Sequence, residues 1–189
     1  MTVKKPEAIV IGASAGALEA LTVILPSLPE DFPAPIIIVV HIPPDKRSVL
    51  AELFRAKCHI KVIEAEDKEP LAPATAYFAP PDYHLLVENR QTLGLTNEEP
   101  VLFSRPSIDI LFETAADIFG PDVTAILLTG ANQDGARGLH TIAEAGGQVI
   151  VQDPKTAFAA AMPQAALQLC PEATVMTLRE ISEYLGRMG

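Results

Sequence analysis

Short apolar runs alternate with segments of helical periodicity along this chain. Residues 7–11 and 36–40 are almost unbroken apolar runs, which is typical of strands buried on both faces of a parallel sheet. The segment between them predicts a helix that starts after Ser14 and ends at Pro26. Its apolar stripe would be formed by Leu18, Leu21, Thr22 and Leu25.

The second half of the chain repeats this alternation. Ser107 is a plausible N-cap for a helix whose buried stripe would be Ile108, Leu111, Phe112, Ala115 and Phe119. Strands are predicted at 124–128, 148–152 and 173–177, and each is followed by a helix. Gly146 is placed to cap the helix that ends at Ala145.

The middle of the chain has shorter predicted strands, separated by turn residues. A helix is expected over 48–57 with Ser48 as its N-cap, and a short strand over 60–63. Short extended pieces at 77–79, 85–88 and 92–95, separated by turn residues, predict an antiparallel hairpin attached to the main sheet.

Strands that alternate with helices imply a doubly wound α/β fold. We expect a mostly parallel sheet with right-handed crossovers, arranged as a Rossmann-like three-layer sandwich with the added hairpin. No linker or internal repeat divides the 189 residues, so a single domain with a short tail at 1–6 is predicted.

The first strand ends in Gly12-Ala-Ser14-Ala-Gly16, a Gly-x-Ser-x-Gly spacing. Such a spacing suits a nucleophile on a tight strand-to-helix turn, with the N–H of Ala15 facing an oxyanion. The alternative is a mere tight turn or a phosphate site. A dinucleotide fingerprint would need glycine where the chain has Ser14 and Ala17.

His41 and Asp134 follow two other predicted strands, and parallel strands bring their carboxyl ends to one edge of the sheet. Histidine can take the serine proton, and a buried carboxylate would orient the histidine. The non-catalytic alternatives are that His41 ends its strand for structural reasons and that Asp134 only caps the following helix. The order Ser, His, Asp differs from that of the α/β-hydrolases.

Composition limits the classes of binding partner and the cellular compartment that we expect. A formal net charge of -10 argues against nucleic acid. Cys58 and Cys170 are expected to be reduced thiols, and the chain has no signal peptide or membrane-spanning run, which predicts a cytoplasmic protein. His59, His84 and His140 are assigned no role.

The motifs together resemble the catalytic domain of the chemotaxis protein-glutamate methylesterase (CheB) family. They run from about Ala8 to Leu169 and comprise IGASAG (11–16), VHIP (40–43), FAPPDYHL (78–85), RPSIDILF (105–112), LTGANQDG (128–135) and QDPKTA (152–157) with Met162-Pro163. The resemblance implies that glutamate γ-methyl esters on the cytoplasmic helices of chemoreceptors are hydrolysed to release methanol. It further implies that some members deamidate receptor glutamines, and it implies no cofactor or metal.

By motif, the family's catalytic residues fall on Ser14, His41 and Asp134. Ala15, Ala131 and Met162 would supply oxyanion or substrate contacts. The chain departs from the family pattern at Ala17, in the loop 130–135 and at Ala161. The family usually has an N-terminal receiver domain that gates the site. None is expected within these 189 residues, which implies either a piece of a longer protein or a stand-alone form; a separate regulator is the partner expected for the latter.

Three hypotheses follow from the sequence. The first is a serine esterase of this family. The second is a non-catalytic docking module on the same fold, and the third is a dinucleotide binder, which His41 disfavours because that site would want Asp or Glu near this point.

Overall fold

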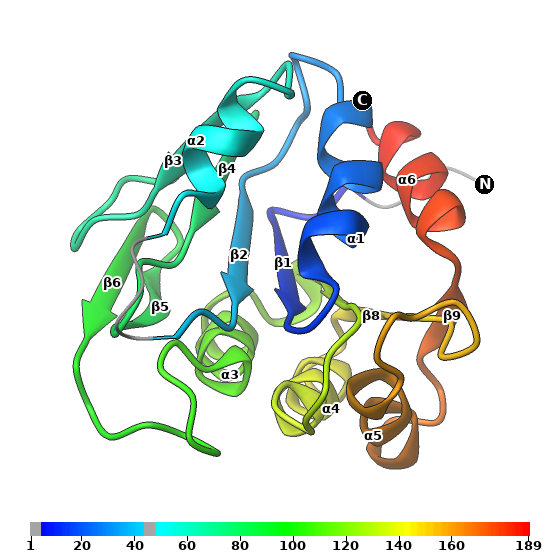
Figure 1. Cartoon of the computed structure of the whole chain (residues 1–189). Coiled ribbons are helices and arrows are strands. Elements are labelled where there is room, and N and C mark those ends of the chain that lie inside the picture. Colours follow the sequence, from blue (N-terminus) through cyan, green and yellow to red (C-terminus); the bar gives the residue numbers. More distant parts are fainter. Residues whose placement is uncertain (1–4, 44–47) are drawn as a thin grey trace.

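The computed structural model describes residues 5–43 and 48–189. The helix–strand alternation forms a seven-stranded sheet with the order β3-β4-β2-β1-β7-β8-β9, and every pair of neighbouring strands is parallel. These strands are β1 (Ala8–Ala13), β2 (Ile36–Val40), β3 (Lys61–Glu64), β4 (Thr75–Phe78), β7 (Val123–Leu127), β8 (Gln148–Gln152) and β9 (Thr174–Met176). The doubly wound three-layer prediction is confirmed (Figure 1).

Helices cover both faces of this sheet (Figure 1). The helices are α1 (Ala17–Ile24), α2 (Leu50–Arg55), α3 (Ile108–Phe119), α4 (Ala136–Glu144), α5 (Ala161–Leu169) and α6 (Leu178–Gly186), with short 3₁₀ turns at Leu25–Ser27 and Gly120–Asp122. Side chains of β1 alternate between the two layers. Val10 packs with α3 and α4, whereas Ile9 and Ile11 pack with α1 and α6.

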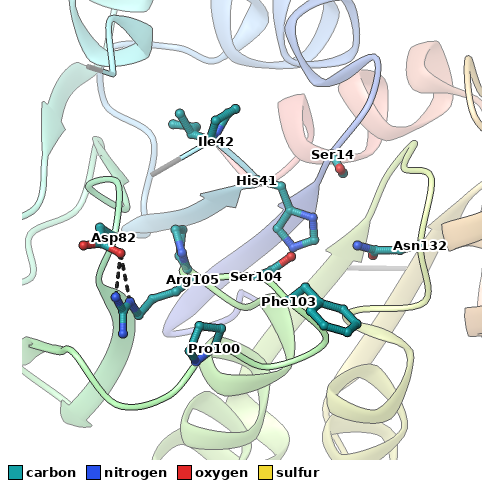
Figure 2. A pocket seen from close by; sticks show the side chains of 11 residues that line it. Ser14, His41, Ile42, Asp82, Pro100, Phe103, Ser104, Arg105 and Asn132 are labelled. Carbon is teal, nitrogen blue, oxygen red and sulfur yellow. Dashed lines mark hydrogen bonds and ion pairs between the residues drawn. The ribbon is translucent and has the colours of Figure 1, made fainter. Parts of the chain in front are cut away.

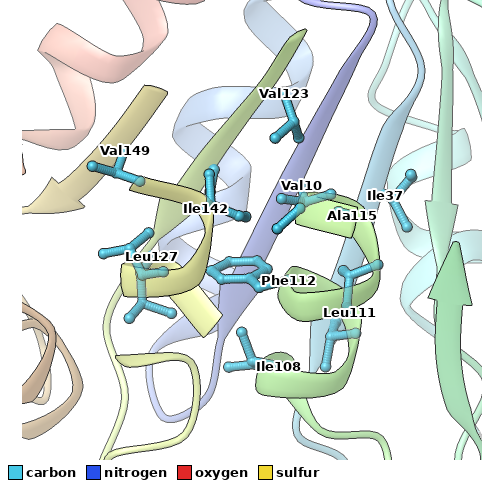
Figure 3. Close-up of a cluster of buried hydrophobic side chains, with 14 of the residues drawn as sticks. Val10, Ile37, Ile108, Leu111, Phe112, Ala115, Val123, Leu127, Ile142 and Val149 are labelled. Atoms are coloured by element: carbon cyan, nitrogen blue, oxygen red, sulfur yellow. The ribbon is translucent and has the colours of Figure 1, made fainter. Parts of the chain in front are cut away.

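The core beneath α3 and α4 shows how sequence periodicity becomes packing (Figure 3). The predicted α3 stripe is wholly buried and meets Val10, Ile37 and Leu127 from the sheet. In α1, by contrast, Leu18 is exposed and Ala17, Ala20, Leu21 and Ile24 form the buried face. The predicted α1 stripe was therefore wrong at Leu18 and at Thr22, which is also exposed, and right at Leu21 and Leu25.

The middle of the chain corrects two predictions. Residues 77 and 78 of the 77–79 piece belong to β4, which pairs with β2 and β3 inside the main sheet. All four residues of Thr75–Phe78 are buried, as expected for a strand inside the sheet. The hairpin of β5 (His84–Asn89) and β6 (Thr92–Thr96) forms its own two-stranded sheet. It contributes Leu85, Val87 and Leu93 to the core that contains α3, instead of extending the main sheet.

Helix boundaries also differ from expectation at two caps. The helix predicted from Ser48 begins at Leu50, with Val49 at the N-cap position. Ser107 occupies the N-cap position of α3, but its side chain makes no cap hydrogen bond. The tail predicted at 1–6 falls mostly outside the described residues.

The strand order creates a switch point beside β1. The chain runs from β1 to β2 and β4 on one side, and later crosses to β7 and β8 on the other. Ligands of doubly wound sheets bind in the crevice at such a point, beyond the carboxyl ends of the strands. Ser14, His41 and Asp134 follow β1, β2 and β7, so all three lie at this crevice.

Candidate active site

Ser14 lies at the end of β1 on a turn that hydrogen bonds hold from two sides. Its N–H donates to the carbonyl of Thr129 (2.9 Å), and the Thr129 hydroxyl donates to the carbonyl of Ala15 (2.8 Å). Gly16 has φ 85°, and a Cβ at this position would lie 2.6 Å from the Cβ of Phe158. Only glycine fits both constraints, so the turn requires it. The turn leaves Ser14 lining a pocket.

Gly12 allows a helix to approach β1 closely. A Cβ at Gly12 would overlap the side chain of Ile108, the first residue of α3. The missing side chain therefore brings the N-terminus of α3 against the end of β1. This close approach positions the backbone N–H groups that hold Asp134.

His41 follows β2, and its N–H donates to the carbonyl of Ala13 (3.2 Å), next to Ser14. Its Nε2–H donates to Asp134 Oδ2 at 2.7 Å, and the side chain is only 12% exposed. Because Asp134 occupies Nε2, Nδ1 is the nitrogen left to accept a proton. Serine proteases use the two ring nitrogens the other way round.

Asp134 is completely buried and accepts four hydrogen bonds. Oδ2 accepts from His41 and from the N–H of Ile108 (2.7 Å), and Oδ1 accepts from the Ser107 hydroxyl (2.9 Å) and the N–H of Asp109 (3.0 Å). Burial raises the pKa of Asp134, but the hydrogen bonds from His41, Asp109 and Ile108 outweigh it and hold the pKa below its usual value.

Asp134 thus caps a different helix from the one that the sequence suggested. Gly135 holds the N-cap position of α4, whereas the Asp134 carboxylate binds the first two N–H groups of α3. Asp109 in α3 reciprocates, because its Oδ1 accepts from the N–H groups of Gly135 (3.0 Å) and Gly138 (2.8 Å) at the start of α4. The two helix N-termini are therefore capped by each other's aspartate.

The second carboxyl of this pair titrates differently. Burial raises the pKa of Asp109 to about 6; the Gly138 N–H opposes the increase and the charge of Asp134 adds to it. Neighbouring environments therefore push the two carboxyl pKa values apart, which favours an ionised Asp134.

Ser14 and His41 line one open pocket of about 360 Å³ (Figure 2). No hydrogen bond joins their side chains within the part of the chain that the structure describes. Loose contacts between a nucleophile and its base are common in unliganded enzymes. Phe103, Arg105 and Asn132 also line this pocket.

The three residues predicted to contact the oxyanion or the substrate, Ala15, Ala131 and Met162, differ in their surroundings. Among the described residues, neither Ala15 nor Ala131 donates its backbone N–H to an acceptor, and their role as oxyanion donors stays a prediction. Met162 is fully buried, its side chain packs against Gly130 and its N–H donates to the Gly130 carbonyl (3.0 Å). This placement favours Met162 as a support for the loop before Asp134 and not as a direct substrate contact.

Sequence reasoning missed the residues that shape the pocket wall. Arg105 donates to Asp82 (2.6 Å; Figure 2) and to the carbonyls of Asn97 and Glu98 (3.0 Å each), which fixes the 97–105 loop. Arg105 and Asp82 both occur in the motifs that carry the family resemblance, so the sequence marked these two residues but did not indicate what they do.

His84, which the sequence left without a role, supports the site from below the surface. It is buried, its Nδ1 accepts the N–H of Ser107 (3.1 Å) and its Nε2–H donates to the carbonyl of Glu99 (3.0 Å). His84 therefore links the pocket loop to the residue that bonds Asp134.

Other groups lie outside this site. Cys58 and Cys170 are free thiols, as predicted. His140, Cys170 and Glu172 bring possible metal-ligand atoms within 4.8 Å of one another, and none of them lines the pocket. No helix in the described ranges is long and apolar enough to cross a bilayer.

Comparison with known proteins gives a consistent result. A family model described as CheB methylesterase matches residues 9–185. A putative protein-glutamate methylesterase/protein-glutamine glutaminase of Leptospira interrogans serovar copenhageni is 46% identical over 182 residues, which is 96% of this chain and 94% of that protein. A protein-glutamate methylesterase/protein-glutamine glutaminase of Azospirillum brasilense is 36% identical over 98% of this chain, which corresponds to 48% of that protein.

A solved structure has the same fold. The Thermotoga maritima CheB methylesterase catalytic domain matches with a TM-score of 0.91 and 33% sequence identity, covering 97% of this chain and 99% of that one.

Proposed function

The chain belongs to the CheB methylesterase family, and we propose that it hydrolyses glutamate γ-methyl esters on chemoreceptors and releases methanol. The single observation that carries this proposal is the buried Asp134–His41 pair beside Ser14. Serine alone is a poor nucleophile, and this pair supplies an oriented base.

In the first half of the reaction, Ser14 Oγ attacks the γ-carbonyl carbon while its proton passes to His41 Nδ1. Asp134 stabilises the resulting imidazolium through the 2.7 Å hydrogen bond from Nε2–H. The tetrahedral intermediate then collapses, the C–O bond to the methoxy group breaks, and His41 returns the proton to release methanol. A glutamyl ester on Ser14 remains.

In the second half, His41 takes a proton from water as the water attacks this ester. Collapse breaks the bond to Ser14 Oγ, which recovers its proton, and the substrate leaves as glutamate. The N–H groups of Ala15 and Ala131 are the proposed donors to the oxyanion in both halves. No step requires a cofactor.

The same chemistry extends to glutamine, whose leaving group is ammonia. The relatives from Leptospira and Azospirillum carry both activities in their names, so we include receptor glutamine deamidation in the proposal. We further propose that the protein works in the cytoplasm on the cytoplasmic helices of its receptors, and that a separate regulator controls it. The non-catalytic docking module is not favoured, because the relatives are named as enzymes.

Two measurements test the proposal. A fluorophosphonate probe should label Ser14 covalently, because it reacts only with an activated serine. Receptor membranes carrying radiolabelled methyl esters should release methanol with the wild-type protein and not with Ser14→Ala. Absence of both signals from the wild-type protein would remove the esterase assignment.

A further inference from the structure

Two phenylalanines stand out from the other five of this chain. Phe32, Phe54, Phe78, Phe112 and Phe119 are all at most 1% exposed, whereas Phe103 is 105% exposed and Phe158 is 79% exposed. Large apolar side chains that gather on a surface mark interaction sites, although single ones do not. Whether these two side chains form an interaction site therefore depends on where they lie relative to Ser14.

Both phenylalanines lie beside the candidate nucleophile. Phe103 lines the pocket together with Ser14 and His41 (Figure 2). Phe158 packs at Gly16, two residues after Ser14, where a Cβ would come within 2.6 Å of its own Cβ. The next residue, Ala159, donates its N–H to the Thr129 hydroxyl (2.9 Å), which fixes this segment to the serine turn.

The backbone displays Phe103 in an unusual way. Val101 and Ser104 exchange two backbone hydrogen bonds (3.0 and 2.8 Å), which closes a two-residue turn over Leu102 and Phe103. Both central residues have positive φ, 48° and 64°. Such a turn normally contains Asn and Gly, because large side chains are strained there. The turn nevertheless carries two large apolar side chains, and strain of this kind concentrates at functional sites.

Two further exposed apolar residues extend the surface on the side of α1 and α2. Leu18 is 47% exposed and Val49 is 56% exposed, and both line a second hollow that also includes Ser14 and His41. We call Leu18, Val49, Phe103 and Phe158 the apolar rim. Leu18 is the residue that helical periodicity had placed in the core.

The surroundings of Ser14 favour a substrate held by side chains. β1 is paired with β2 on one side and β7 on the other, so it offers no free edge for an extended peptide. An α-helix hydrogen-bonds its own backbone and presents side chains three and four residues apart on one face.

Charge favours the ester over the product. The pocket cation Arg105 is already engaged by Asp82 and two carbonyls. On a protein of net charge -10, a pocket whose arginine is already paired and whose rim is apolar accepts the neutral methyl ester more readily than the glutamate anion.

From these observations we infer that the apolar rim is the docking surface for a receptor helix whose apolar side chains lie one turn to either side of the esterified glutamate. This inference rests on the proposed function. The ester carbonyl must reach Ser14 Oγ, so the helix that carries it has to lie across the rim. Phe103 and Phe158 then act as specificity determinants that contact the substrate away from the reacting bond.

The test compares a methylated cytoplasmic fragment of a receptor with a small soluble ester, p-nitrophenyl acetate. Phe103→Ala and Phe158→Ala should each lower the ratio of kcat/KM for the receptor fragment to kcat/KM for the small ester by roughly tenfold. The loss should lie mainly in KM. Phe103→Leu, which keeps an apolar side chain at this position, should restore most of the ratio.

Val175→Ala is the matched control, because Val175 is 46% exposed on β9 at the edge of the sheet and lines neither hollow. It should leave the ratio unchanged. Unchanged ratios in both phenylalanine variants would overturn the docking inference and leave the esterase proposal standing. A wild-type protein that hydrolyses the small ester but releases no methanol from the receptor fragment would overturn the proposed substrate and the inference together.

Discussion

Replacing Asp134 by asparagine tests the site and the fold at once. Each carboxylate oxygen accepts one hydrogen bond from a backbone N–H of α3, at Ile108 or Asp109, and a second from His41 or Ser107. An amide has only one accepting atom. In either orientation, its NH₂ group therefore faces a backbone N–H that has lost its acceptor.

The size of the effect follows from this mismatch. A buried donor without a partner costs about 1–3 kcal/mol, and loss of the charge at the N-terminus of α3 adds about 0.3–1 kcal/mol. We expect Asp134→Asn to unfold with a free energy lower by about 2–4 kcal/mol. For a domain of this size, the melting temperature then falls by about 5–15 °C.

Turnover should fall as well, by at least about 10²-fold. The corresponding change in a serine protease costs about 10⁴, but methanol is an easier leaving group than an amine. The assay is methanol release at a temperature where circular dichroism shows the variant folded. Asp117→Asn changes an exposed aspartate in α3, the helix that Asp134 caps; it is the control and should change neither quantity.

The two readouts separate the two roles of Asp134. A destabilised variant with full turnover would remove Asp134 from the catalytic machinery. A variant with wild-type stability would refute the capping argument, whatever its activity.

Three further changes test other parts of the molecule. Ser14→Ala should abolish methanol release, by about 10⁴-fold or more, with an unchanged melting curve; retention of a tenth of the turnover contradicts the assignment. Gly12→Ala should lower the free energy of unfolding by about 1–3 kcal/mol, because the new methyl group overlaps Ile108; urea unfolding that matches the wild type would contradict this. The Asp109 pKa of about 6 lies above its ordinary 3.8, so the wild type loses stability as pH rises through about 6. Asp109→Asn keeps the Oδ1 acceptor and should gain about 1–2 kcal/mol on the wild type between pH 4 and pH 8, and a pH-independent difference would refute this.

Periodicity predicted most of the fold because the central strands are buried on both faces. The segments around Ile9 and Ile38 are apolar throughout, which is typical of a parallel sheet covered by two helical layers. β4 was misassigned to the hairpin because its four residues lie among prolines and near two true hairpin strands. β4 lies between β2 and β3 because it pairs with both, and the local sequence pattern does not show which strands will pair.

The candidate site was predictable where a residue ends a central strand. Ser14 and His41 come directly after β1 and β2, Asp134 lies in the loop after β7, and the fold brings them to one crevice. The contacts of Asp109 could not be predicted in this way, because they depend on how α3 packs across the N-terminus of α4. Those of His84 depend on how β5 lies against Ser107 and the carbonyl of Glu99.

The crossed capping of α3 and α4 explains how a fully buried carboxylate stays ionised. Burial alone would favour the protonated form of Asp134, which could not stabilise an imidazolium. The hydrogen bond from the His41 ring and two N–H groups at the N-terminus of α3 counter that tendency and lower the pKa of Asp134. Asp109 lies in the same junction with fewer donors, so its carboxyl takes up a proton first as the pH falls toward 6. Its protonation removes a negative charge beside Asp134 and leaves the catalytic carboxylate as the anion over a wider pH range.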